Sequence, residues 1–261
     1  MPLPTEVSDW IARSEVDHVG PFVNAWAAFN AWYRHISGSS RDRDGLNYVR
    51  THPNSVRGAI MPMIDPLTHD TPDAVQFKQL IANLHGTLEA YRLETLHKGA
   101  IEHVSFRSVP LRNGKSLPQS STYSRITYQV TKSNGRWIST VTNRSGVETA
   151  RIEQADYDLA ALQAHANYIS LPITGKGQLR ALYTDCNPRP MSDLLVGSEP
   201  AIIAGTIHFR STCEDLFGGV IETIYRMRNM LLHGELKPDT AALACYEPAY
   251  RLLRRMLQEC R

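Results

Sequence analysis

The 261-residue chain lacks the sequence features of several large classes of protein. Its four cysteines are widely separated and include no Cys-x-x-Cys pair, so they predict reduced thiols rather than a disulfide framework. No apolar run approaches the roughly 20 residues that span a bilayer. The start, "MPLPTEVSDW", has no basic segment followed by an apolar one. The sequence therefore predicts a cytoplasmic protein with neither a signal peptide nor a membrane segment.

Short motifs of common enzymes are also missing. There is no HExxH and no paired Cys/His spacing, so we expect no metal site, and no motif indicates a cofactor. The stretch "TGKGQ" at 174–178 lacks the first glycine and the hydroxyl residue of a phosphate-binding loop, and no GxSxG is present. The formal net charge of +2 neither demands nor excludes a nucleic-acid partner, because one face can be basic while the total is near zero.

Helical periodicity is the main positive signal. In residues 21–36, Phe22, Trp26 and Tyr33 share one apolar stripe, which predicts an amphipathic helix. Residues 199–209 are apolar and fit a helix or a strand, and we favour a helix. In the tail, Pro248 either kinks a helix or starts it. We predict helices over 21–36, 73–97, 156–169, 177–183, 199–209, 211–233 and 246–257.

The segments between the first helices have a different character. Residues 37–45, "SGSSRDRDG", predict a solvated loop, and the proline-containing stretch 52–72 predicts irregular structure. Residues 101–154 are rich in Thr, Ile, Val, Tyr and Trp around Asn134-Gly135, which is a strong hairpin signal. The sequence thus predicts a mainly α (α+β) protein, a single domain over 1–261 with a β-rich insertion at 101–154.

The most informative stretch is "YRMRNMLLHGE" at 225–235. A Ser-x-x-Glu capping box at 211–214 predicts the start of its helix, and Gly234 a left-handed end. On a helical wheel, Glu222, Tyr225, Asn229 and His233 share one stripe. Arg228 lies about 140° around from His233 on a straight helix. The two cannot easily converge on one atom from one rigid helix, but they can if a second copy of the helix packs against the first, which indicates a homodimer.

These polar residues have a chemical and a structural interpretation. A histidine near neutral pKa transfers protons, and an arginine holds a phosphate with a fork of donors. With Asn229 to orient them, Arg228 and His233 suit metal-independent cleavage of RNA, whose ribose 2′-OH supplies the nucleophile. In the structural interpretation, His233 caps the helix, Glu222 pairs with Arg226, and Asn229 faces water. Spacing alone leaves both interpretations open.

The stretch Arg228, Asn229, Met230-Leu231-Leu232, His233 resembles the Arg-polar-x3-His signature of the HEPN superfamily (higher eukaryotes and prokaryotes nucleotide-binding). The helix "AWAAFNAWYRH", with its embedded Asn30, is similar to the first helix of many members. This resemblance implies a helical bundle, a homodimer with a composite active site, and often a metal-independent endoribonuclease of toxin–antitoxin or antiphage systems. It implies catalytic roles for Arg228 and His233, a supporting role for Asn229, and a weaker one for Glu222.

The resemblance leaves about half of the chain uncovered, and some of its members bind or dimerise without catalysis. We therefore expect an endoribonuclease with an RNA substrate and an antitoxin or defence-system partner. The alternative is a noncatalytic dimerisation or nucleotide-binding module. Tyr225 and Asn30 are further supporting candidates, since a buried amide needs partners. Arg251, Arg254 and Arg255 form a basic patch that suits either RNA backbone or solubility.

Overall fold

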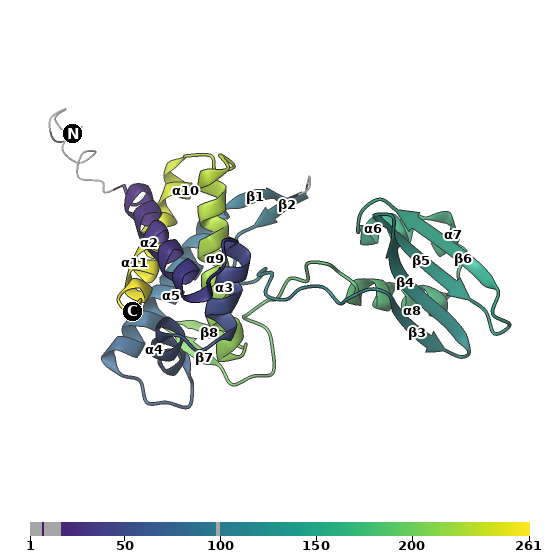
Figure 1. The fold of residues 1–261 in the computed structure, drawn as a ribbon, viewed down its shortest axis with the longest axis horizontal. Helices are drawn as coiled ribbons and strands as arrows, with labels where there is room; N and C mark the ends of the chain where they lie inside the picture. Colours follow the sequence, from purple (N-terminus) through teal and green to yellow (C-terminus); the bar gives the residue numbers. More distant parts are fainter. Residues whose placement is uncertain (1–6, 8–16, 98–99) are drawn as a thin grey trace, which may run out of the picture. The chain divides into compact units, whose positions relative to one another are not determined.

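The structure, a computed structural model, describes residue 7 and residues 17–97 and 100–261. It is a mixed α+β structure in which helices make up about half of the described residues. Two compact units with separate hydrophobic cores divide the chain. The first joins Met1–Leu111 to Ser192–Arg261, and the second is Arg112–Met191 (Figure 1). The second unit shares residues 112–154 with the predicted β-rich insertion and adds three helices after them.

The first unit is a helical bundle with two small hairpins. Helices α2, α5 and α11 pack side by side, and α3 and α4 pack against α9. Each hairpin is an antiparallel pair, β1 with β2 and β7 with β8. The elements are α2 (Val19–Ser37), α3 (Asp42–Thr51), α4 (Ser55–Ile64), α5 (Pro72–Tyr91), β1 (Glu94–His97), β2 (Ala100–His103), β7 (Ile202–Ala204), β8 (Ile207–Phe209), α9 (Cys213–Leu232), α10 (Thr240–Ala244) and α11 (Tyr246–Leu257).

The predicted aromatic stripe of the first helix is confirmed as core. Phe22, Phe29 and Tyr33 on α2 are almost completely buried. Tyr246 at the start of α11 meets Phe22 edge to face, with ring centroids 5.2 Å apart, and its hydroxyl donates to the carbonyl of Met227 at 3.0 Å. These buried aromatic contacts stabilise the packing of α2, α9 and α11 against one another. Helix α11 begins at Tyr246, so Pro248 lies in its first turn, where proline is tolerated.

Several predictions about local structure are wrong. Within 199–209, residues 202–209 form the β7–β8 hairpin rather than a helix, and Gly205 supplies the positive φ of its turn. The stretch 52–72 is not wholly irregular: Asn54 accepts from the Arg57 amide and starts α4. The long helix predicted to reach residue 97 ends at Tyr91, and β1 follows it.

Helix α9 carries the sequence stretch of greatest interest. Its N-cap is Thr212, whose hydroxyl accepts from the Asp215 amide at 3.0 Å, so the helix is capped one residue after the predicted Ser211. Gly218 lies inside the helix against α3, where an added Cβ would meet Nε of Arg50 at 2.9 Å. The helix ends as predicted, with Gly234 at a φ of +67°.

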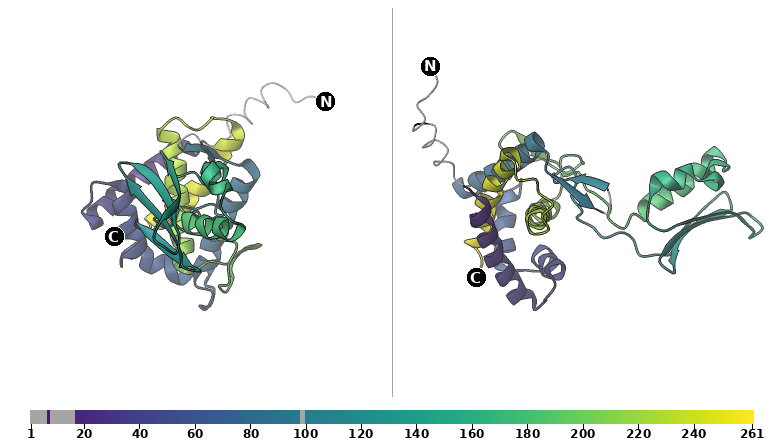
Figure 2. Two further views of the ribbon diagram at one scale, coloured as in Figure 1. Left: turned by 90° about the vertical axis from the view of Figure 1, so that its right-hand side faces the viewer. Right: turned by 90° about the horizontal axis from the view of Figure 1, so that it is seen from above.

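The second unit is a four-stranded antiparallel sheet in the order β3-β4-β5-β6, with helices on one of its faces (Figure 2). The predicted hairpin at Asn134-Gly135 is confirmed: it joins β4 to β5, and both residues have positive φ. The helix predicted over 156–169 is split at His165. The elements are β3 (Gln119–Tyr123), β4 (Ile126–Ser133), β5 (Arg136–Thr142), β6 (Glu148–Gln154), α6 (Leu159–Ala164), α7 (Ala166–Ile169) and α8 (Ile173–Asp185).

Candidate functional site

The last two turns of α9 hold the residues of the predicted motif. Met230 is buried in the core, while Arg228 and Asn229 are partly exposed. His233 is the C-cap residue, and its backbone N–H donates to the carbonyl of Asn229 at 2.9 Å. The motif therefore spans the boundary between the core and the surface at one end of the helix.

Arg228 is held in place by contacts from three elements. Its Nη1 donates to Oδ1 of Asn229 at 2.9 Å, and its Nη2 lies 3.6 Å from Oδ2 of Asp42 at the start of α3. The guanidinium carbon lies 5.9 Å from the ring centroid of Trp26 on α2. Its Nε is buried without a hydrogen-bond partner among the described residues. The side chain is 21% exposed, so the guanidinium is fixed yet still reaches the surface.

Asp42 links Arg228 to the first helix. Its Oδ1 accepts a hydrogen bond from Nδ2 of Asn30 at 2.9 Å, and the same amide contacts the hydroxyl of Tyr33. Burial raises the pKa of Tyr33, and the hydrogen bond and charge of Asp42 raise it further. Tyr33 therefore remains a neutral phenol that can donate to the carboxylate. Asn30, predicted to need partners, finds them in the same group as Arg228.

Tyr225 and Glu222 lie about one and two turns before Arg228 on α9 and share a different partner. Glu222 is 1% exposed, and its Oε2 pairs with Nη1 of Arg43 at 2.5 Å. The Arg43 guanidinium lies over the Tyr225 ring, 4.8 Å from its centroid. Burial lowers the pKa of Arg50, and the charge of Glu222 acts in the opposite direction. A predicted helical pair of Glu222 with Arg226 is not formed, since Arg226 lies 3.1 Å from Glu102 instead.

The structure thus gathers three of the predicted site residues in one group and leaves His233 apart from them. Arg228, Asn229 and Asn30 meet around Asp42. The imidazole of His233 is exposed and forms no hydrogen bond or ion pair with another described residue. Within one copy of the chain, the guanidinium and the imidazole are therefore not held against each other. Arg228 can hold an anion, and His233 is open to proton transfer with a bound molecule.

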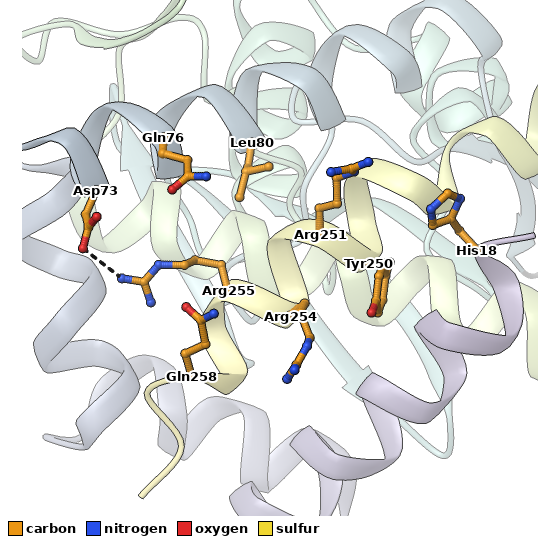
Figure 3. Close-up of a pocket in the computed structure, with 9 residues that line it drawn as sticks. All are labelled: His18, Asp73, Gln76, Leu80, Tyr250, Arg251, Arg254, Arg255 and Gln258. Carbon is orange, nitrogen blue, oxygen red and sulfur yellow. Dashed lines mark ion pairs between the residues drawn. The ribbon is translucent and has the colours of Figure 1, made fainter. Parts of the chain in front are cut away.

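The predicted basic patch lies on α11, beside a groove between α11 and α5 (Figure 3). Arg251 lies 2.8 Å from Glu247, and Arg255 lies 2.6 Å from Glu259. Arg254 is exposed and has no acidic partner in the described part of the chain. Carboxylates therefore balance two of the three positive charges. The groove is lined by His18, Asp73, Gln76, Leu80, Tyr250, Arg251, Arg254, Arg255 and Gln258.

Comparisons of this chain with protein-family models, with curated proteins and with solved structures find no match. Within the described residues, no group of three or more His, Cys, Asp or Glu side chains is arranged to hold a metal ion. None of the helices at 17–97 and 100–261 combines the length and apolar character needed to cross a membrane. The interpretation of the site therefore depends on its own residues.

Sequence reasoning missed Asp42 and Arg43, which it assigned to a solvated loop. Both lie in the first turn of α3 and point their charges at α9, Asp42 to Arg228 and Arg43 to Glu222. A signal was present in the sequence, because Asp42 and Asp44 are the acidic residues that favour a helix N-terminus. Alternating charges are also typical of solvated loops, and only the tertiary packing of α3 distinguishes the two.

Proposed function

We propose that this protein is a metal-independent endoribonuclease of the HEPN type that works as a homodimer. His233 transfers the proton, Arg228 binds the scissile phosphate and stabilises its developing charge, and Asn229 orients Arg228. Glu222, Tyr225 and Asn30 support the helix and the α2–α3 framework around it. One observation carries this proposal. Arg228 is held by Asp42 and Asn229, while the His233 imidazole is exposed and has no hydrogen bond or ion pair with another described residue.

The proposed reaction is an internal transesterification. The His233 imidazole accepts the proton of the ribose 2′-OH, and the 2′-oxygen forms a bond to phosphorus. The bond from phosphorus to the 5′-oxygen breaks, and that oxygen takes up a proton from a protonated imidazole. The products are a 2′,3′-cyclic phosphate and a 5′-OH. A fixed guanidinium favours such a step because it stabilises charge without reorganising.

Two copies of the chain are needed to bring the groups together. Arg228 and His233 point about 140° apart on one straight helix, and within one copy they do not meet. Leu232, next to His233, is 52% exposed, and an apolar side chain at that position suits a contact between two copies of α9. In the proposed dimer, Arg228 of one copy faces His233 of the partner subunit.

The first test is RNA cleavage by the purified chain in EDTA, beside Arg228→Ala and His233→Ala. Controls are Arg180→Ala and His69→Ala, which remove the same side chains from exposed positions without described partners. The proposal expects cleavage by the wild type and both controls and its loss in both motif variants. No cleavage over a broad RNA panel, or equal activity in all five proteins, would rule it out.

Mixing the two inactive variants tests the composite site. A dimer of one Arg228→Ala chain and one His233→Ala chain keeps one intact Arg228 and one intact His233 on opposite copies. The proposal expects activity to return after the subunits exchange. If mixed dimers form, as shown by two affinity tags, and remain inactive, the two residues do not act across the interface.

A second candidate function is a noncatalytic dimerisation or nucleotide-binding module. One observation favours it: the charge of Arg228 is already paired with Asp42 within the chain. The module hypothesis expects Arg228→Ala to weaken dimerisation or nucleotide binding while RNA stays intact with every variant. Sedimentation of the wild type and Arg228→Ala, read beside the cleavage assay, separates the two functions.

A further inference from the structure

The second unit contains a cavity that the proposed nuclease does not use. It lies between the inner face of the sheet and the start of α8, and its volume is about 510 Å³. That volume is within the range of small-molecule sites in proteins. All of its lining residues belong to the second unit, and none of the described ones is charged. Its apolar wall includes Ile126, Val141, Leu171 and Pro172.

A buried tyrosine presents an unused hydroxyl to this cavity. Tyr128 on β4 is 2% exposed and lines the cavity. Its hydroxyl has no hydrogen-bond partner among the described residues, so it is available to a molecule in the cavity. The hydroxyl lies 3.5 Å from the position that a Cβ of Gly175 would occupy, which places it beside the first turn of α8. Burial raises the pKa of Tyr128, so the group stays protonated and can donate.

The first turn of α8 offers further donors at the same place. Its N-cap is Pro172, which makes no side-chain cap. The first helical amide bond runs from Lys176 to the carbonyl of Pro172. The amides of Ile173, Thr174 and Gly175 consequently have no acceptor in the described part of the chain. Free amides at a helix N-terminus favour an anionic acceptor.

We propose that this cavity binds a small carboxylic acid with an apolar body. The carboxylate accepts from the Tyr128 hydroxyl and the free amides at the start of α8, and the apolar body lies against the wall of Ile126, Val141 and Leu171. A carboxylate fits better than a phosphate ester because no arginine or lysine lines the cavity to balance a second charge. The absence of a side chain at Gly175 leaves a methyl-sized space between the hydroxyl and the helix, which one carboxylate oxygen can occupy.

Calorimetric titration of the full chain with octanoate tests the proposal, with octan-1-ol as the uncharged analogue. Gly175→Ala places a methyl in ordinary contact with the Tyr128 hydroxyl and with Leu171, 3.5 and 3.7 Å away, so the variant can fold. Gly177→Ala on the same helix is the matched control, because a Cβ there meets nothing within 4 Å. Tyr128→Phe removes the hydroxyl alone.

We expect octanoate to bind to the wild type and to Gly177→Ala with the same affinity. Binding should weaken at least about tenfold in Gly175→Ala and in Tyr128→Phe, since a hydrogen bond to a charged group is worth this much. Octan-1-ol should bind more weakly than octanoate. The proposal is overturned if the wild type does not bind octanoate at millimolar concentration, if the two glycine variants bind it equally, or if octan-1-ol binds as tightly.

Discussion

Replacing Arg43 should destabilise the first unit through the buried carboxylate of Glu222. Glu222 is 1% exposed, and Arg43 supplies its ion pair at 2.5 Å. Its Oε1 has no hydrogen-bond partner among the described residues, so the carboxylate depends on this pair. In Arg43→Ala the charge stays buried and loses that partner. Removing one partner of a buried ion pair costs about 3–5 kcal/mol in general.

Two features of the structure reduce that figure. The Arg43 side chain is 55% exposed, so solvent screens the pair, and Arg50 lies within electrostatic reach of the same carboxylate. We therefore expect Arg43→Ala to lower the free energy of unfolding by about 2 kcal/mol. Glu222→Gln leaves an exposed arginine and a neutral amide and should cost only about 1 kcal/mol. The double variant, Arg43→Ala with Glu222→Gln, should then be no less stable than Arg43→Ala alone, because the neutral amide of Gln carries no charge that Arg43 would have to balance.

Hydrogen exchange measured by mass spectrometry suits this test, because the two units have separate cores. Protection of α9 reports on the first unit, and protection of β5 serves as an internal control that should not change. Arg251→Ala is the matched variant: its pair with Glu247 is short, at 2.8 Å, but both partners are about half exposed. It should cost less than about 1 kcal/mol. Additive losses in the double variant would refute the dependence of Glu222 on Arg43.

Two further predictions concern stability. Gly234→Ala should destabilise the chain by about 1 kcal/mol because of its φ of +67°. Gly58→Ala, at a helical site with nothing within 4 Å, should not destabilise it; urea unfolding compares the two. Burial lowers the pKa of His85 in the folded chain. As pH drops below about 6.5, the unfolded chain therefore binds a proton before the folded chain does, and the free energy of unfolding decreases as the pH decreases. His85→Gln should flatten this slope, by at most about 1.4 kcal/mol per pH unit, and an unchanged slope would refute it.

A fourth prediction concerns the mechanism that positions Arg228. Asp42→Asn keeps the acceptor for Asn30 but removes the negative charge 3.6 Å from the guanidinium. If Asp42 only orients Arg228, RNA cleavage should fall several-fold while the fold is retained. Unchanged cleavage in a folded Asp42→Asn protein would show that Asn229 and the packing over Trp26 are sufficient to hold the guanidinium.

Much of the fold was predictable where local signals and packing agree. Three features show this: the aromatic stripe from Phe22 to Tyr33, the turn at Asn134-Gly135 and the cap at Gly234. In each of them the residue type strongly favours one local structure, and the fold has that structure. Where a local signal fits two geometries, packing decides. Residues 199–209 are apolar enough for a buried helix, yet their short alternating stretches pair as β7 and β8.

The candidate site was predictable only in part, for a related reason. The spacing on α9 identifies Arg228, Asn229 and His233, because a helix fixes how its own side chains are arranged. The partners of those side chains come from other elements. Asp42 and Arg43 lie more than 170 residues earlier in the chain, and their alternating charges are typical of a solvated loop. Only the packing of α3 against α9 brings them to Arg228 and Glu222.

The most direct test of the proposed RNA cleavage is the chemistry of the product ends. The purified chain is incubated in EDTA with an RNA that it cuts and with the same RNA carrying 2′-O-methyl groups. Transesterification driven by His233 and Arg228 predicts a 2′,3′-cyclic phosphate, a 5′-OH, and no cleavage of the methylated strand. Products with a 3′-OH and a 5′-phosphate, or cleavage of the 2′-O-methyl RNA, would contradict it.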